Sequence, residues 1–332
     1  MKATILGYGA WSTAMAIHLH NLGNPVTLWG RSGEKAAAIA QTRENPRLPG
    51  ILLPGGMEIS SNPDCVLGSA LVVFAVPSAT LRPVAREFAP RIPPDALLVC
   101  VTKGLEADTG LTMSQVIAQE TGREPVVLTG PSHAEEVSRG LPTGLLAASE
   151  NQQQAEAVQD IFLCPTLRVY TSPDPMGAQL GGALKNVIAL CAGICDGLGY
   201  GDNAKAMLMT RGLTETARLG RSLGARQETF AGLAGVGDLI VTCTSMHSRN
   251  RRAGILIGQG LRTPDALAQV GAVVEGYYAA RSAHILSRAQ NIDMPITQAT
   301  YRILYEGSDV GQEVQSLLTR QKKAETEDAG WL

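Results

Sequence analysis

The chain begins MKATILGYGAWSTAM, and residues 3–12 of this stretch decide the fold. Four apolar or small residues (Ala3–Leu6) predict a β-strand, and the pattern after the glycines predicts a helix. In a strand, turn and helix of this kind, Gly7 permits the tight turn and Gly9 lets the backbone approach a pyrophosphate, whose charge the helix N-terminus binds. Ser12 replaces the usual third glycine but is small enough for close helix–strand packing. The stretch therefore predicts a dinucleotide-binding site.

The same alternation continues through the first half of the chain. Apolar runs that predict strands are Ala3–Leu6, Val26–Trp29, Leu71–Val76, Leu97–Val101 and Val126–Leu128. Segments that predict helices are Trp11–Leu22, Lys35–Gln41, Leu81–Phe88 and Leu111–Glu120. Continuous apolar runs separated by helices are typical of a parallel sheet covered on both faces. We therefore predict an α/β domain with a mainly parallel sheet.

The second half has a different pattern. The alternation stops near Leu167–Tyr170, and from Pro175 onward the chain is rich in alanine and leucine, with glycines such as Gly220 and Gly224 where helices would end. This pattern predicts an all-α domain. We place a dinucleotide-binding domain at residues 1–175, a helical substrate-binding and catalytic domain at 176–322, and a charged tail at 323–332.

Composition excludes several classes of protein. Apolar residues make up 45% of the 332 residues and charged residues 17%, which indicates a globular protein, and the net charge of −2 provides no basic field for nucleic acid. No signal peptide is visible, so we expect a cytoplasmic protein. The apolar stretch Met176–Cys195 carries Gln179, Lys185 and Asn186 near its middle, and we expect a buried helix without integral membrane association.

The cysteines do not indicate a metal site. None of the six forms a C-x-x-C pair. Cys191 and Cys195 are four residues apart and could share one helix face, but no histidine is nearby. We therefore interpret them as buried thiols and expect no metal.

The end of the second predicted strand bears on the choice of cofactor. An NAD-specific site places Asp or Glu about there for the ribose hydroxyls, whereas this chain has Arg31. A guanidinium can pair with the 2′-phosphate of NADPH and stack on adenine. The alternative is a solvated loop arginine. We predict a preference for NADPH, with NADH also accepted.

Two lysines and one loop are candidates for chemistry. Lys185 lies in the apolar run LGGALKNVIAL, where it either extends its ammonium to the surface or stays buried with a depressed pKa. Lys103 directly follows a predicted strand, and ligands of parallel sheets bind beyond the carboxyl ends of strands. The loop Leu128–Ala134 has the same placement. Each of these residues taken singly could also be an ordinary loop or surface residue.

A third candidate is the segment from Gly235 to Arg252. It combines the carboxylate of Asp238 with hydroxyl groups and three arginines, which suit a phosphate gripped by charge-assisted hydrogen bonds. The alternatives are a nucleic-acid patch or a solvated helix face. Aromatic residues for stacking are lacking, which argues against nucleic acid.

Taken together, these motifs resemble the bacterial NAD(P)-dependent sn-glycerol-3-phosphate dehydrogenase family over nearly the whole chain. The stretches that carry the resemblance are Gly7–Ala16, Lys103–Glu106, Gly130–Glu136, Gly182–Leu190, Asp196–Lys205, Gly235–Ser245, Ser248–Arg252 and Val273–Gly276. The resemblance implies a Rossmann-type N-terminal domain and a C-terminal domain similar to that of 6-phosphogluconate dehydrogenase. It also implies reversible reduction of dihydroxyacetone phosphate to sn-glycerol 3-phosphate for glycerophospholipid synthesis.

The resemblance assigns roles to individual residues. Lys185 is implied to be the proton acceptor. On chemical grounds we expect Lys103 to stabilise charge on the substrate oxygen and to lower the pKa of Lys185, and Asp238 to hold Lys185 and to oppose that shift; the sequence leaves open which effect on the pKa is larger. The implied substrate contacts are Lys103, Gly130, Ser132, Lys185, Asp238, Ser248, Arg249 and Asn250. The implied cofactor contacts are Ala10, Trp11, Arg31, Lys103, Ala134, Arg249, Val273 and Glu275, to which the glycine turn adds Gly7 and Gly9.

The chain departs from the family pattern at three positions. Ala10 and Ser12 stand where the family usually has serine and glycine, so Ala10 can contribute only its backbone N–H. His133 stands where phenylalanine is frequent. We treat His133 as ordinary variation.

Two other functions are considered. One is a β-hydroxyacid or sugar-acid dehydrogenase of the same two-domain build, which would need a carboxylate site in place of the phosphate grip. The other is a non-catalytic NAD(P)-binding sensor, which has no need of Lys103, Lys185 and Asp238 together. A homodimer suits the architecture.

Overall fold

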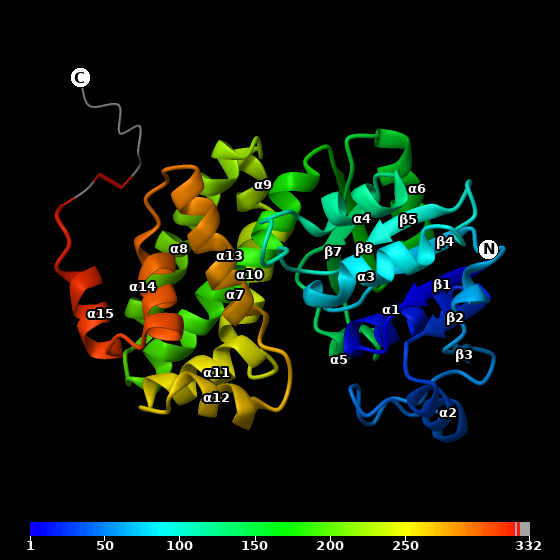
Figure 1. Cartoon of the computed structure of the whole chain (residues 1–332), viewed down its shortest axis with the longest axis horizontal. Coiled ribbons are helices and arrows are strands. Elements are labelled where there is room, and N and C mark those ends of the chain that lie inside the picture. Colours follow the sequence, from blue (N-terminus) through cyan, green and yellow to red (C-terminus); the bar gives the residue numbers. More distant parts are fainter. Residues whose placement is uncertain (323, 326–332) are drawn as a thin grey trace.

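The computed structural model describes residues 1–322 and 324–325. Figure 1 shows two halves side by side, with a sheet and its flanking helices on the right and a purely helical half on the left. The predicted α/β domain followed by an all-α domain is confirmed. Most of the predicted charged tail, residues 323–332, lies outside the described residues.

Within the described residues, eight strands form one sheet. They are β1 (Ala3–Leu6), β2 (Val26–Trp29), β3 (Glu58–Ser60), β4 (Leu71–Phe74), β5 (Leu97–Cys100), β6 (Val126–Thr129), β7 (Thr143–Ala148) and β8 (Leu167–Ser172). Their order is β3-β2-β1-β4-β5-β6-β7-β8, and every neighbouring pair is parallel except β6 and β7. The strand order reverses direction at β1, between β2 and β4. This is the place where ligands of doubly wound sheets bind.

Helices cover both faces of the sheet. They are α1 (Ala10–Asn21), α2 (Gly33–Thr42), the 3₁₀ turn Pro63–Val66, α3 (Ser78–Phe88), α4 (Met113–Thr121), α5 (Ala134–Val137) and α6 (Gln152–Phe162). Successive strand residues therefore enter different cores: Ile5 and Val73 pack on one face, Leu6 and Phe74 on the other. Because both faces are buried, the strands are apolar without alternation.

Three strands were missed by the sequence analysis. β3 is only three residues long and not fully buried, so it lacks an apolar run. β7 contains Thr143 and Gly144, which weaken its pattern. The segment Leu167–Tyr170, where the predicted alternation stops, forms most of β8 and pairs with β7.

The second half is helical throughout its described residues. Its elements are α7 (Pro175–Gly197), α8 (Asp202–Ser222), α9 (Gln227–Ala231), the π-helical turn Leu233–Gly237, α10 (Asp238–Thr244), α11 (Arg249–Gly258), α12 (Thr263–Val270), α13 (Glu275–Ala289), α14 (Pro295–Tyr301), the π-helical turn Arg302–Glu306 and α15 (Val310–Leu318). Gly220 does not end a helix as predicted. It lies inside α8, where a Cβ would overlap the ring of Phe230, and α8 ends at Ser222, shortly before Gly224.

Helix α7 is the centre of this half. It is long and apolar enough to cross a membrane, but 94% of its most apolar window is buried, as in the core helix of a soluble protein. Gly193 of α7 faces Gly254 of α11, so the two helix backbones pack closely; a Cβ added at Gly254 would lie 2.9 Å from the Cα of Gly193. This crossing places the start of α11 against the middle of α7.

Candidate active site

The two glycines of the turn between β1 and α1 differ in backbone conformation and in the space around them. Gly7 has a φ of +134°, and a Cβ there would lie 2.6 Å from the carbonyl oxygen of Ala75, so this position requires glycine. Gly9 caps α1 in an extended conformation. A Cβ on Gly9 would meet nothing closer than Oγ of Ser12 at 3.4 Å. The space beside Gly9 at the helix N-terminus is therefore open to a ligand.

Side chains around the turn hold its shape. Ser12 is fully buried and donates a hydrogen bond to the Gly9 carbonyl oxygen at 2.9 Å, so the helix accommodates serine in place of glycine. Asn45 donates to the carbonyl oxygen of Tyr8 at 3.0 Å and to Oγ1 of Thr13 at 2.7 Å. The sequence analysis missed Asn45, because 37 positions separate it from Tyr8.

The end of β2 lies beside this turn. Arg31 is exposed two residues after the strand, and its guanidinium makes no hydrogen bond or ion pair within the described part of the chain. The indole N–H of Trp11 is buried and likewise finds no described partner. An open helix N-terminus with an unengaged guanidinium nearby fits a dinucleotide that carries an additional phosphate.

A cluster of charged side chains surrounds Asp238, the first residue of α10. The Nζ of Lys103, in the loop after β5, donates to Oδ2 of Asp238 at 2.7 Å, and the Nζ of Lys185, on α7, donates to Oδ1. Lys185 also donates to Oγ1 of Thr242 at 2.7 Å, and Thr242 donates to the Asp238 carbonyl oxygen at 2.6 Å. Lys185 is 7% exposed and Asp238 1%. Lys185 therefore stays buried and does not extend to the surface.

Burial dominates the electrostatics of this cluster. The pKa of Lys185 is lowered to about 8: burial is the largest cause and the positive charge of Lys103 acts in the same direction, whereas Asp238 raises the pKa. The opposing effect of Asp238 is thus outweighed. Burial also lowers the pKa of the His133 side chain, and the charge of Lys185 adds to that effect.

The loop after β6 closes over the cluster. The Nζ of Lys103 donates to the carbonyl oxygen of Gly130 at 3.0 Å, and Oγ of Ser132 donates to the same oxygen at 2.9 Å. Gly130 has a φ of +137°, and a Cβ there would lie 2.9 Å from the carbonyl oxygen of Gly144. The hydroxyl of Thr129 is buried beside Gly182 with no described partner, a polar atom that the sequence analysis missed.

The segment predicted to grip a phosphate divides into two parts. Asn250 donates to Oδ1 of Asn186 at 2.8 Å and accepts from the N–H of Gly276 at 2.8 Å, so its amide ties α11 to α7 and α13. Ser248 is buried and its Oγ caps α11 by accepting from the N–H of Arg251. These two side chains position the helix N-terminus.

The three arginines of this segment do not act together. The Nε of Arg251 donates to Oδ2 of Asp196 at 2.7 Å, so its guanidinium is engaged in the helical half. Arg249 and Arg252 remain exposed. The predicted grip therefore retains only these two arginines.

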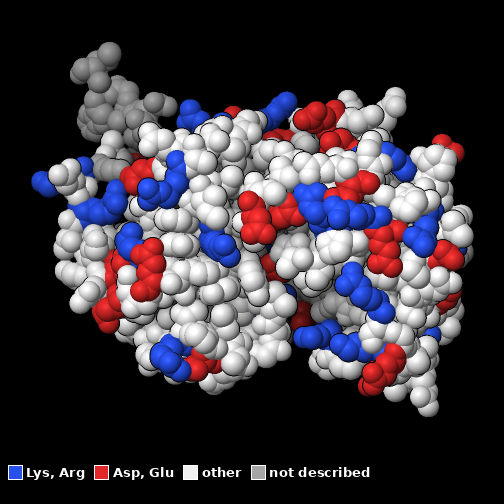
Figure 2. Space-filling view, in the orientation of Figure 1, with Lys and Arg blue, Asp and Glu red and all other residues white. Residues whose placement is uncertain are grey.

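Residues from both halves meet at their junction. Ser78, the first residue of α3, donates to Oε2 of Glu275, the first residue of α13, at 3.0 Å. Burial raises the pKa of Glu275, while Ser78 and the nearby Arg249 lower it. Val273 is 41% exposed in the turn before α13. Figure 2 shows a hollow between the two halves, in the lower middle of the view, with basic side chains along its right-hand side.

No group of three or more metal-binding side chains gathers among the described residues. The thiols of Cys191 and Cys195 lie on α7; Cys191 is buried, with its Sγ 2.8 Å from Oγ1 of Thr300, whereas Cys195 is only partly buried, contrary to expectation, because it lies near the end of the helix.

Comparison with known proteins bears on what this arrangement does. The family model for the N-terminus of NAD-dependent glycerol-3-phosphate dehydrogenase matches residues 2–155, and the model for its C-terminus matches residues 174–315. "Glycerol-3-phosphate dehydrogenase [NAD(P)+]" of Pelotomaculum thermopropionicum is 51% identical, covering 98% of this chain and 95% of the relative. The protein of the same name from Moorella thermoacetica is 49% identical, with 98% of each chain covered.

A solved structure agrees with these relatives. The crystal structure of glycerol-3-phosphate dehydrogenase from Coxiella burnetii is 37% identical and superposes with a TM-score of 0.92. The match covers 96% of this chain and 99% of that one. The similarity therefore extends over both halves and the junction between them.

Proposed function

The chain belongs to the NAD-dependent glycerol-3-phosphate dehydrogenase family, and we propose that it interconverts dihydroxyacetone phosphate and sn-glycerol 3-phosphate with a nicotinamide cofactor. It is thus an NAD(P)-dependent oxidoreductase. The observation that carries the proposed mechanism is the buried cluster in which Lys103 and Lys185 share the carboxylate of Asp238. A hydroxyl–carbonyl interconversion needs one group that exchanges a proton with the substrate oxygen.

The cofactor, when bound, supplies the hydride that reduces the substrate carbonyl carbon or accepts it in reverse. We assign the proton to Lys185. In reduction its ammonium donates a proton to the carbonyl oxygen, and in oxidation its neutral amine accepts the hydroxyl proton. A pKa lowered to about 8 makes both forms accessible near neutral pH. Lys103 stabilises the negative charge that grows on the oxygen.

Binding of the phosphate is assigned to the start of α11. The exposed Arg249 supplies positive charge, and the N-terminal N–H groups of this ten-residue helix are held in place by Ser248 and Asn250. The phosphate lies away from the reacting carbon, so its binding energy positions that carbon. The complete set of proposed substrate contacts is Lys103, Gly130, Ser132, Lys185, Asp238, Ser248, Arg249 and Asn250.

The cofactor site is assigned to the β1–α1 turn and the facing edge of the helical half. Gly9 leaves space for the pyrophosphate, and Arg31 supports a preference for NADPH over NADH. The complete set of proposed cofactor contacts is Gly7, Gly9, Ala10, Trp11, Arg31, Lys103, Ala134, Arg249, Val273 and Glu275.

The decisive experiment follows NADPH oxidation at ~340 nm with dihydroxyacetone phosphate, and with β-keto acids and the keto derivatives of sugar acids as competing substrates. Selective turnover of dihydroxyacetone phosphate is expected, since the site offers an arginine and a helix N-terminus to a phosphate. Turnover of the acids alone supports the β-hydroxyacid alternative. NADPH binding without turnover of any substrate supports the sensor.

Domain boundaries, oligomeric state and location complete the proposal. Strand β8 ends at Ser172 and α7 begins at Pro175, which supports a domain boundary at residue 175.

We propose a cytoplasmic homodimer, whose product feeds glycerophospholipid synthesis. A hollow of about 1500 Å³ lies between α8 and α15, with exposed Tyr200, Met207 and Leu318 beside it. Exposed apolar surface of this kind supports a contact between two copies of the chain. Light scattering after size exclusion distinguishes the dimer from a monomer.

A further inference from the structure

The loop at residues 103–112 crosses from the sheet half into the helical half. Its first residue, Lys103, reaches Asp238. Leu105 is 3% exposed and packs in the core of the helical half, with Leu184 and Phe230. The next residue turns back toward the sheet half. The loop that carries Lys103 is therefore attached to both halves within four residues.

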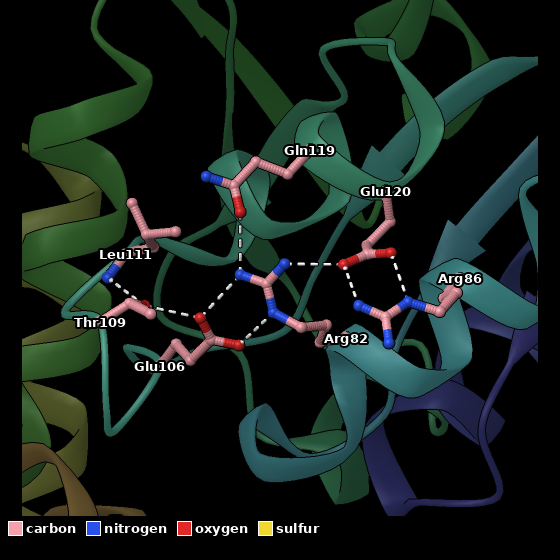
Figure 3. A network of polar contacts seen from close by, with 7 residues as sticks. All are labelled: Arg82, Arg86, Glu106, Thr109, Leu111, Gln119 and Glu120. Atoms are coloured by element: carbon pink, nitrogen blue, oxygen red, sulfur yellow. Dashed lines mark hydrogen bonds and ion pairs between the residues drawn. The ribbon is translucent and has the colours of Figure 1, made fainter.

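Arg82 makes the attachment on the sheet side, as Figure 3 shows. From α3 it binds Glu106 through two parallel hydrogen bonds, Nε to Oε1 and Nη2 to Oε2, each 2.7 Å long. Its Nη1 donates to Glu120 of α4, also at 2.7 Å. Both side chains of the fork are partly buried, 25% and 18% exposed, and a bidentate pair of an arginine and a carboxylate is among the stronger ion pairs.

The loop adds bonds of its own around Glu106. Thr109 donates to Oε2 of Glu106 at 2.6 Å and accepts from the N–H of Leu111 (Figure 3). The backbone N–H of Glu106 donates to the carbonyl oxygen of Leu111 at 2.9 Å. The carboxylate of Glu106 thus organises the whole turn, and its orientation depends on Arg82.

We propose that Arg82 is a positioning residue for the reaction: its fork on Glu106 fixes the loop and thereby holds the ammonium of Lys103 on Asp238, beside Lys185. This inference rests on the proposed function. A lysine side chain has many rotamers, and fixing its backbone reduces the freedom it loses on binding Asp238. Without the fork, Leu105 and the loop's own backbone hydrogen bonds would remain, but the carboxylate of Glu106 would lose its tie to α3, and Lys103 would spend less time on Asp238.

The consequence reaches Lys185 through charge. The titratable groups around its ammonium are Asp238, Lys103, His133 and Cys243. Of these, Lys103 contributes a positive charge that lowers the pKa of Lys185. When Lys103 moves away, the pKa of Lys185 rises, and oxidation of sn-glycerol 3-phosphate needs a higher pH.

The experiment compares Arg82→Gln with Arg86→Gln. Arg86 lies one turn later on α3 and, among the described residues, binds Glu120 but not Glu106, so it is a matched control. Arg82→Gln is expected to lower kcat about tenfold, a loss of orientation, and to move the rising limb of the oxidation profile, on the acid side of the pKa of Lys185, up by roughly half a pH unit. NADPH affinity, measured by fluorescence titration, is expected to fall by less than kcat, because Lys103 is one of ten proposed cofactor contacts. Arg86→Gln is expected to leave all three quantities at the wild-type value. Arg82→Lys, which keeps the charge without the fork, should recover only part of kcat.

Glu106→Gln provides a second route if Arg82→Gln fails to fold. It removes the same ion pair from the other side and should give the same shift of the limb, and the double variant should be no worse than either single one. Equal pH profiles for wild type, Arg82→Gln and Glu106→Gln overturn the inference. A folded wild type that binds NADPH but does not turn over dihydroxyacetone phosphate overturns the proposed function instead.

Discussion

The cofactor turn and the lysine cluster are built in opposite ways. The turn consists of neighbours in sequence, Gly7 to Ser12, and its shape follows from backbone geometry. The cluster brings Lys103 and Lys185 to Asp238 across 135 and 53 positions, and its properties follow from burial and charge. Substitutions in the turn should therefore change stability and cofactor binding, whereas those in the cluster should change the chemistry.

The largest effect is expected from Lys185→Ala. Loss of the proton-exchanging group should lower kcat about 10²–10⁴-fold while NADPH affinity stays unchanged. Steady-state kinetics and fluorescence titration measure the two quantities. Lys205→Ala is the control, because Lys205 pairs with Asp196 in the same half. A kcat within a few-fold of wild type would show that Lys185 is not the group that exchanges a proton with the substrate.

Gly7→Ala tests the turn. The new Cβ would lie 2.6 Å from the Ala75 carbonyl oxygen, and alanine would have to adopt a positive φ. The free energy of unfolding, measured in urea, should therefore fall by about 1–3 kcal/mol. Gly9→Ala has room for its methyl group, and its stability should change by less than about 0.5 kcal/mol while the KM for NADPH rises. Equal stability of the two variants would contradict the distinction drawn between these glycines.

The pH dependence of the reaction tests the cluster without a substitution. Because the pKa of Lys185 is lowered to about 8, its neutral form becomes dominant above that pH. The kcat for oxidation should rise about tenfold per pH unit below the pKa and level off above it, and the kcat for reduction should fall there. Profiles with both limbs near the ordinary lysine value of ~10.4 would show that burial does not act on this group.

Arg31→Ala should give the smallest effect. Exposed charge pairs contribute up to ~1 kcal/mol, so the KM for NADPH should rise up to about fivefold while that for NADH is unchanged. Arg139→Ala, another exposed arginine of the sheet half, is the control. Equal changes in the KM for NADPH and for NADH would show that Arg31 does not discriminate between the two cofactors.

Prediction from sequence succeeded where structure is local. The strands Ala3–Leu6 and Val26–Trp29 agree with β1 and β2 to the residue, because buried central strands are continuous apolar runs. It failed for β3 and β7, whose pairing with neighbours compensates for a weak pattern of their own.

The candidate site divides in the same way. Lys103, Lys185 and Asp238 could be identified as candidates, but their meeting depends on contacts between the two halves. The support residues Asn45 and Arg82 could not be found, because their partners lie 37 and 24 positions away. Neither residue stands in a motif that marks it.

The sequence by itself determined the alternation of strands and helices, the glycine turn that leaves a helix N-terminus open, and the residue types available for proton transfer. Each follows from local spacing and the conformational range of single residues. Only the tertiary structure decided that Lys185 stays buried beside one carboxylate and a second lysine, and hence that its pKa falls to about 8. That outcome depends on desolvation and on charges from distant segments, which act only once the two halves are packed together.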